Sequence, residues 1–155
     1  MASIQVHVRR AEEILHLTYA LTGELRQIRL PPPAPRLRRD ELWRTTCFEA
    51  FVARPDGSYA EFNLSPSGAW AAYRFESYRE GMGPLDIPPP DIRTGSADDR
   101  LTVEVAVALP WGGPVRLGLS AVVEEAEGVI SYWALAHPAA KPDFHHPDSF
   151  VHGLP

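Results

Sequence analysis

Residues 42–67 read LWRTTCFEAFVARPDGSYAEFNLSPS, and this stretch predicts a β-hairpin. Its turn signal is Pro55-Asp56-Gly57, which fits a three-residue loop made of a type I turn followed by glycine in the left-handed conformation. Such a loop pairs Arg54 with Ser58 and leaves a bulge at Gly57. Counting back along the two strands, the register pairs Val52 with Ala60, Ala50 with Phe62 and Phe48 with Leu64.

This register divides the hairpin into two faces, because side chains alternate across a strand. The face that carries the last three pairs is wholly apolar and suits a buried core. The other face, called the mixed face below, carries Trp43, Thr45, Cys47, Glu49, Phe51, Tyr59, Glu61, Asn63 and Ser65. A two-residue loop would instead place Glu61 and Asn63 among the core residues, at a cost of roughly 1–3 kcal/mol each if they were unpaired. The sequence therefore favours the three-residue loop.

Short strands account for most of the remaining chain. Apolar residues recur mostly at every second position, and helix signals are almost absent. The pattern predicts strands over residues 4–8, 14–21, 101–109, 115–124 and 129–136. Residues 81–99 show little periodicity, so we expect the longest loop there, as a plain connector rather than a functional loop. The expected fold class is all-β, a two-sheet antiparallel β-sandwich in which residues 1–155 form a single domain.

The strand that follows the hairpin can add a cation to the mixed face. Two alternating sets share residues 69–76: Ala69, Ala71, Tyr73 and Phe75, against Trp70, Ala72, Arg74 and Glu76. If the first, smaller set points inward, Arg74 lies on the mixed face beside Glu49 or Glu61. Spacing alone leaves two roles open, a salt bridge between Glu49 and Arg74 on a solvated sheet or a binding role for both.

Composition excludes several classes of protein. The chain has 155 residues, 45% of them hydrophobic and 23% charged, which is ordinary for a globular protein with one core. The formal net charge is −5, and the short basic run Arg36, Arg38 and Arg39 lacks the density of a nucleic-acid footprint. Cys47 is the single cysteine, so we expect neither an intrachain disulfide nor a Cys-based zinc site.

The pattern of the first ten residues is not that expected of a targeting signal. Residues 1–10 alternate apolar and polar side chains without a continuous apolar segment. We therefore expect neither a signal peptide nor a membrane span, and a cytoplasmic location. The expected partner is a small-molecule ligand, with no nucleic acid and no membrane. The oligomeric state stays open.

Two motifs, one in the hairpin and one near the C-terminus, carry a family resemblance. The first is Trp43-Arg44-Thr45-Thr46-Cys47-Phe48-Glu49-Ala50-Phe51, followed by Tyr59-Ala60-Glu61-Phe62-Asn63. The second is Trp133-Ala134-Leu135-Ala136-His137-Pro138 with Lys141-Pro142-Asp143-Phe144-His145-His146-Pro147. Together they resemble the DOMON-like superfamily, which includes the family 9 carbohydrate-binding modules, and in particular a bacterial DOMON-like group of largely unknown function. The resemblance covers nearly the whole chain and implies a jelly-roll-like β-sandwich that binds sugar or haem.

For the sugar-binding relatives, the resemblance implies specific contacts. In them a tryptophan at the start of the motif and a second aromatic near the C-terminus sandwich the sugar ring, and charged groups between them bind its hydroxyls. By this resemblance Trp43 and Glu49 contact the ligand, with Asn63 and Arg74 as further polar contacts. The chemistry is sound, because the C–H faces of a sugar stack on aromatics and its hydroxyls need convergent polar partners.

The second aromatic is where the sequence departs from these relatives. The C-terminal motif offers Phe144 and His145 where a tryptophan is expected, and we expect these two residues to close the site. The acidic loops that hold calcium in some relatives are not recognisable, so no metal ion is expected. Haem-binding relatives use a methionine with a histidine or lysine as axial ligands. The candidates here are Met82 with His137 or His145.

No motif indicates catalysis. The histidines near the C-terminus show neither HxxxH nor HxH spacing, and their positions are His137, His145, His146 and His152. No Gly-rich phosphate loop, serine elbow or paired-carboxylate signature is present in the sequence. We therefore expect a noncatalytic ligand-binding domain without a cofactor. Haem-dependent electron transfer is the first alternative, and a structural or interaction domain without a small ligand is the second.

Overall fold

Strands form the body of this computed structural model, which describes residues 2–138 and 141–155. They are β1 (Ser3–Ala11), β2 (Ile14–Thr22), β3 (Cys47–Ala53), β4 (Tyr59–Leu64), β5 (Trp70–Phe75), β6 (Gly83–Pro84), β7 (Asp91–Ala97), β8 (Arg100–Ala108), β9 (Val115–Glu124), β10 (Ile130–Ala134) and β11 (His152–Leu154). The helical elements of these residues are short 3-10 turns, η1 (Leu25–Gln27), η2 (Leu42–Arg44) and η3 (Pro147–Ser149). Over the same residues, no helix has the length and apolar character needed to cross a membrane.

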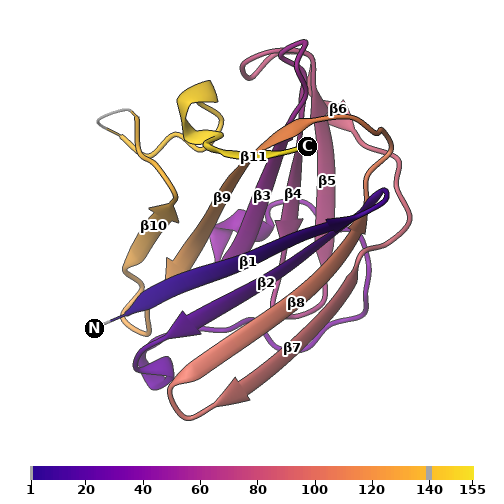
Figure 1. Cartoon of the computed structure of the whole chain (residues 1–155). Helices are drawn as coiled ribbons and strands as arrows, with labels where there is room; N and C mark the ends of the chain where they lie inside the picture. The colour runs from indigo at the N-terminus through magenta and orange to yellow at the C-terminus, as the bar shows by residue number, and fades with distance from the viewer. Residues whose placement is uncertain (1, 139–140) are drawn as a thin grey trace.

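The strands form two antiparallel sheets that lie face to face (Figure 1). One sheet has the order β1-β2-β8-β7, and its strands run across the front of Figure 1. The other has the order β10-β9-β3-β4-β5-β6, and β11 also pairs with β9. The predicted all-β, two-sheet antiparallel sandwich is confirmed.

The hairpin of β3 and β4 has the predicted register. Phe48 lies opposite Leu64, and Val52 lies opposite Ala60. The backbone amide of Arg54 donates to the carbonyl of Ser58 over 2.8 Å, and Gly57 has a φ of +91°. The three-residue loop is therefore confirmed, together with the division of β3 and β4 into a core face and a mixed face. The strands are shorter than predicted: Trp43 lies in the turn η2, Thr45 precedes β3 and Ser65 follows β4.

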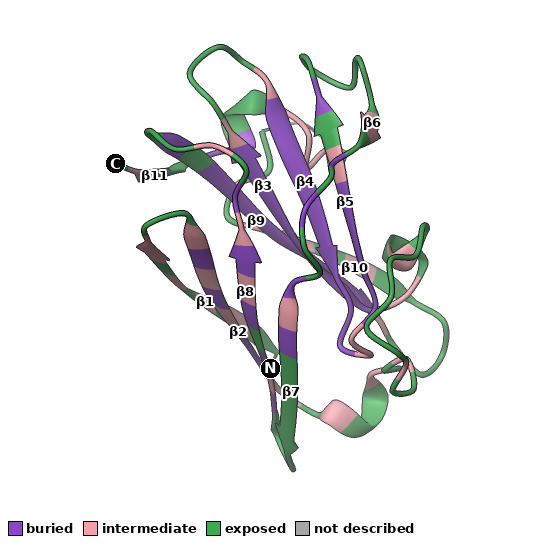
Figure 2. Ribbon diagram, turned by 90° about the vertical axis from the view of Figure 1, so that its right-hand side faces the viewer, coloured by how far each residue is buried: buried purple, intermediate pink, exposed green. Residues whose placement is uncertain are grey.

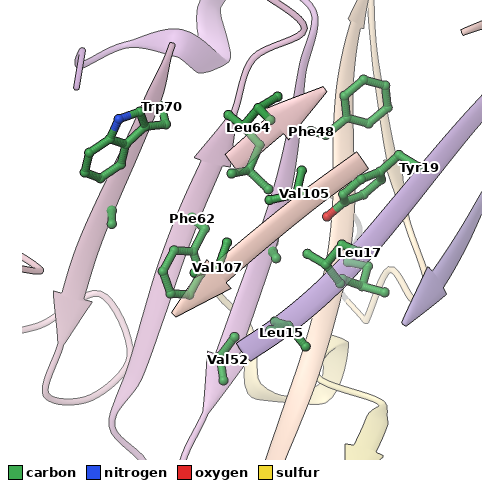
Figure 3. Packing of buried hydrophobic residues seen from close by; sticks show 14 of the residues in the cluster. Leu15, Leu17, Tyr19, Phe48, Val52, Phe62, Leu64, Trp70, Val105 and Val107 are labelled. Atoms are coloured by element: carbon green, nitrogen blue, oxygen red, sulfur yellow. The ribbon is translucent and has the colours of Figure 1, made fainter. Parts of the chain in front are cut away.

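The core fills the space between the two sheets (Figure 3). Phe62 of the hairpin belongs to the same buried cluster as Leu17 of β2 and Val107 of β8. Burial of each such side chain contributes roughly 1.5–3 kcal/mol to folding. A hydrogen bond also joins the sheets, because the buried hydroxyl of Tyr19 donates to the carbonyl of Glu49 over 2.7 Å. The core thus holds β3, the central strand of the candidate site, in a fixed position.

Part of the segment expected to be the longest loop is an edge strand, so that prediction was wrong for residues 91–97. They form β7, in which Ile92 lies opposite Val105 of β8. Ile92 is the one buried residue of this strand, and most of its length is exposed (Figure 2). A strand with one buried residue has little apolar periodicity, so its sequence is hard to distinguish from that of a loop.

Gly57→Ala tests the geometry of the hairpin turn. A Cβ at this position meets nothing within 4 Å, so the expected cost comes from the backbone at a φ of +91°. We expect the free energy of unfolding to fall by about 1 kcal/mol, as measured by urea denaturation. Gly95→Ala is the matched control, because Gly95 also has nothing within 4 Å and does not have a positive φ. An equal loss in both variants would contradict the role of the turn.

Candidate ligand-binding site

The floor of the candidate site is the mixed face of β3 and β4. Glu49 and Phe51 share this face with Glu61, because alternate side chains of paired strands point the same way. These residues are 3%, 1% and 7% exposed, although the face is half polar. Both strands are therefore buried on both faces, as their purple colour in Figure 2 shows.

Segments outside the central strands cover this floor and leave a cavity of about 670 Å³. The turn η2 contributes Trp43, the loop after β5 contributes Arg79 and Met82, and the segment before η3 contributes Phe144 and His145. Among the described residues, the lining is Asp40, Glu41, Trp43, Glu49, Phe51, Glu61, Tyr73, Phe75, Arg79, Met82, Val122, Tyr132, Pro142, Phe144 and His145. Its volume lies within the range of small-molecule sites, which is roughly 300–1,000 Å³.

Four of the predicted ligand-binding residues line this cavity, namely Trp43, Glu49, Phe144 and His145. Trp43 is 47% exposed, which places it at the mouth. Asn63 lies opposite Glu49 in the hairpin but is fully buried and is not part of the cavity lining. Among the described residues its amide makes no hydrogen bond of regular geometry, but it lies close enough to Glu61 to lower the pKa of that carboxyl. Asn63 thus belongs to the floor rather than to the cavity wall.

Arg74 is separated from the other predicted residues, because it lies on the opposite face of the sheet. It pairs with Ala60, whose side chain belongs to the core face. The short turn between β4 and β5 sets this register, so Trp70 points into the core and Tyr73 takes the mixed face. The expectation that the smaller set of β5 side chains points inward was therefore wrong. A salt bridge between Arg74 and Glu49 is also excluded by this placement.

Several cavity residues were missed by the sequence reasoning. Tyr73 occupies the position expected of Arg74, and its hydroxyl donates to Asp40. Tyr132 lies opposite Val122 of β9, which in turn lies opposite Cys47 of the mixed face, so strand alternation contained the signal for Tyr132. Asp40 and Arg79 come from irregular segments, where no periodic pattern identifies a face.

His145 is held by contacts at both ring nitrogens. The backbone amide of Arg79 donates to the Tyr59 hydroxyl over 3.0 Å, and that hydroxyl lies 2.9 Å from Nδ1 of His145. Because a carboxyl oxygen of Glu61 beside Nε2 favours a proton there, we assign the Tyr59 hydroxyl as the donor to Nδ1. Nε2 then carries the ring proton and lies 3.3 Å from Oε1 of Glu61. This network favours a neutral imidazole protonated at Nε2.

Burial sets the protonation states at the floor. Desolvation, with a contribution from the charge of Glu61, raises the pKa of Glu49 to about 8. Desolvation likewise raises the pKa of Glu61 to about 7 and, with the charge of Arg79, lowers the pKa of His145 to about 4. The Ser120 hydroxyl donates to Oε2 of Glu49 over 3.2 Å and opposes the shift of that carboxyl. Near neutral pH the floor therefore holds a neutral imidazole and two carboxyl groups whose pKa values lie close to the pH of the solution.

Comparison with known proteins identifies the architecture. No family model and no curated protein matches the sequence. A structure from Bacteroides uniformis ATCC 8492, described as a "putative carbohydrate-binding protein", superposes with a TM-score of 0.72 at 12% identity over 99% of this chain and 78% of that one. A family 9 carbohydrate-binding module from Caldicellulosiruptor kristjanssonii, in complex with cellotriose, superposes with a TM-score of 0.58 at 10% identity. The match covers 98% of this chain and 73% of that one. The chain shares the fold of these two structures.

A second structure with the family 9 fold extends the comparison. It is a family 9 module from Caldicellulosiruptor kristjanssonii in complex with glucose, with a TM-score of 0.56 at 12% identity over 90% of this chain and 69% of that one. At such identities the likeness establishes the fold. The assignment of individual site residues therefore depends on the geometry of the cavity.

The residues considered for haem do not offer a free pair of axial ligands. Met82 and His145 line the same cavity, but Met82 is 60% exposed and both ring nitrogens of His145 already have partners. His137 is exposed and outside the cavity lining, with its ring 6.4 Å from that of Phe144. Iron ligation by His145 requires the loss of one of its two contacts. Among the described residues, no group of three His, Cys, Asp or Glu side chains is placed to hold a metal ion.

The tautomer of His145 is directly measurable. At pH 6 we expect its ring to be neutral and protonated at Nε2, because its pKa lies near 4 and Tyr59 donates to Nδ1. Nitrogen-15 chemical shifts of the imidazole report both properties. Tyr59→Phe, which leaves Nδ1 without this donor, should lower the free energy of unfolding by about 1 kcal/mol. A charged ring at pH 6, or a proton on Nδ1, would contradict the network.

Proposed function

We propose that the chain is a noncatalytic saccharide-binding module whose site is the cavity over β3 and β4. The observation that carries this proposal is the presence of aromatic walls and a polar floor in one cavity of about 670 Å³. A sugar ring needs both, because its C–H faces are apolar and its edge carries hydroxyls. Trp43, Tyr132 and Phe144 offer the aromatic surface, and Glu49 and Glu61 offer hydrogen-bonding groups.

Tyr132 takes the place of the second tryptophan in this proposal. It is 48% exposed, nearly the same fraction as Trp43 at 47%. Phe144 supports it from the C-terminal segment, with ring centroids 6.2 Å apart and an interplanar angle of 59°. In this arrangement a sugar ring stacks on Trp43 and Tyr132 at the mouth of the cavity, and its hydroxyls form hydrogen bonds with the carboxyls of the floor.

The comparisons support a sugar as the ligand. Two structures with the same fold are family 9 modules in complex with cellotriose and with glucose. The motif from Trp43 to Glu49 resembles the same modules, and both residues line the cavity. Membership of the DOMON-like superfamily is part of this proposal.

The placement of the two floor carboxyls argues against their acting together as a hydrolytic pair. Glu49 and Glu61 belong to neighbouring strands of one sheet and share one face, so both approach a ligand from the floor. Glycoside hydrolysis uses two carboxyls that flank the scissile bond. A pair on one side of the ring can hold hydroxyl groups without cleaving the bond between sugars.

Isothermal titration calorimetry against mono- and oligosaccharides tests the proposed function. We expect at least one sugar to bind with one ligand per chain, and to raise the melting temperature because it binds the folded state. Chromatography of the sugar after incubation checks that the module is noncatalytic, and we expect to recover the sugar intact. Cleavage would overturn the noncatalytic assignment, and the failure of every sugar to bind at millimolar concentration would overturn saccharide binding.

A further inference from the structure

The acidic and basic side chains that line the cavity are unbalanced in number. They are four acids and one arginine: Asp40, Glu41, Glu49, Glu61 and Arg79. Arg79 is already paired, because its Nη2 lies 2.8 Å from Oδ1 of Asp143. Arg44 pairs with Glu41 at 3.1 Å, so the remaining excess of acid lies at Asp40 and at the two carboxyls of the floor.

The two floor carboxyls have no cationic partner of their own. No arginine or lysine of residues 2–138 and 141–155 forms a salt bridge with Glu49 or Glu61. Glu49 accepts from the Ser120 hydroxyl at 3.2 Å, and Oε1 of Glu61 lies 3.3 Å from Nε2 of His145. The Asn63 amide and the charge of Arg79 also act on Glu61, and both lower its pKa. The fully buried amide of Asn63 lies on the same face and lowers the pKa of Glu61, although no hydrogen bond of regular geometry joins the two side chains. The floor thus has acceptor capacity that the described residues do not use.

Aromatic rings surround this acidic floor. Six of them line the cavity: Trp43, Phe51, Tyr73, Phe75, Tyr132 and Phe144. The negative faces of such rings attract an organic cation, and the attraction is greatest where water is excluded. An inorganic ion is a poorer match, because the described residues hold no cluster of three metal-ligating side chains.

We infer that the ligand carries a protonated amino group, which within the proposed saccharide function makes it an amino sugar with a free amine. The ammonium group donates to Glu49 and Glu61, and the ring stacks between Trp43 and Tyr132. An ammonium group has three donors, so it can satisfy both carboxyls together. This inference names the ligand class of the proposed saccharide site and rests on that function.

The protonation states of the floor agree with a cationic ligand. A nearby cation favours the charged form of a carboxyl and lowers its pKa. Glu49 and Glu61, with pKa values of about 8 and about 7, should therefore release protons when the amine binds. The other ionisable groups around them lie in the core, on the mixed face and in the cavity wall, and they are Tyr19, Asp40, Cys47, Tyr59, Tyr73, Arg79 and His145. His145 is neutral, and Arg79 forms its salt bridge with Asp143 and acts on Glu61 through its charge alone, without a salt bridge to either floor carboxyl.

Calorimetry with matched pairs of sugars tests the inference. The pairs are glucosamine with glucose, galactosamine with galactose, and mannosamine with mannose, all titrated at pH 6 into the intact chain. In at least one pair we expect the amino sugar to bind about tenfold more tightly or better. We also expect the release of up to about one proton per ligand, measured from the dependence of the binding heat on buffer ionisation enthalpy.

Charge-removing variants assign the preference to the floor. In Glu49→Gln and Glu61→Gln, we expect the affinity ratio of amino sugar to hydroxyl sugar to fall to about threefold or less, with less proton release. Glu104→Gln is the matched control, because it makes the same charge change at an exposed position of β8 in the other sheet. This control should keep the wild-type ratio.

The outcomes separate the inference from the proposed function. Equal binding within every pair, without proton release, would overturn the amino-sugar inference and leave saccharide binding intact. Binding of methylammonium without binding of any sugar would overturn the saccharide function. No binding of any of these probes would overturn both.

Discussion

Trp43→Ala is expected to weaken saccharide binding about 10- to 100-fold, which corresponds to roughly 1.4–2.8 kcal/mol. Trp43 is 47% exposed at the mouth of the cavity, so its truncation removes the stacking surface without opening the core. Calorimetry with the tightest-binding sugar measures the loss. The melting temperature should change little in the absence of ligand.

Trp111→Ala is the matched control for this substitution. Trp111 lies outside the cavity lining, with its ring 5.3 Å from the guanidinium carbon of Arg54. We expect its affinity for the same sugar to equal that of the wild type, measured well below the melting temperature of both proteins. Wild-type affinity in Trp43→Ala, or an equal loss in Trp111→Ala, would remove Trp43 from the site.

The free energy of unfolding should fall by about 2 kcal/mol between pH 6.5 and pH 8. Burial raises the pKa of Glu49 to about 8 and that of Glu61 to about 7, whereas the unfolded chain has ordinary carboxyls that titrate near 4.5. Over this interval the folded state binds more protons than the unfolded state, so its stability is lost as the pH rises. The lowered pKa of His145 has the opposite effect, because it makes the free energy of unfolding rise with pH, but only between about pH 4 and 6.5.

The double substitution Glu49→Gln and Glu61→Gln isolates this effect. Neutral amides cannot titrate, so most of the fall between pH 6.5 and 8 should disappear. Urea denaturation at several pH values measures it, and Glu104→Gln should retain the wild-type slope because Glu104 is exposed. A wild-type protein whose stability is constant or rises over this interval would contradict the burial of ionisable carboxyls at the floor.

The hairpin was predictable because its information is local. Pro55-Asp56-Gly57 sets the loop length, and strand alternation then assigns Phe62 to the core face and Glu61 to the mixed face. The motif resemblance located Trp43 and Glu49, which line the cavity. These features depend on neighbouring residues in the sequence or on a recognisable pattern.

The face assignment in β5 was not predictable from alternation. Both alternating sets of this strand contain apolar residues, so either could face the core. The register set by the turn after β4 decides it, with Trp70 opposite Leu64 and Tyr73 opposite Glu61. Asp40 and Arg79 were missed for a different reason, because their positions depend on tertiary contacts of irregular segments.

Chemical-shift mapping with the tightest-binding saccharide is the most direct test of ligand binding in this cavity. We expect the largest changes at the indole N–H of Trp43, the amides of Glu49 and Glu61, and the segment around His145. A second hollow of about 520 Å³, on the other sheet beside His16, provides the internal comparison. Changes confined to that hollow, or no changes with any saccharide tested, would contradict saccharide binding in the cavity over β3 and β4.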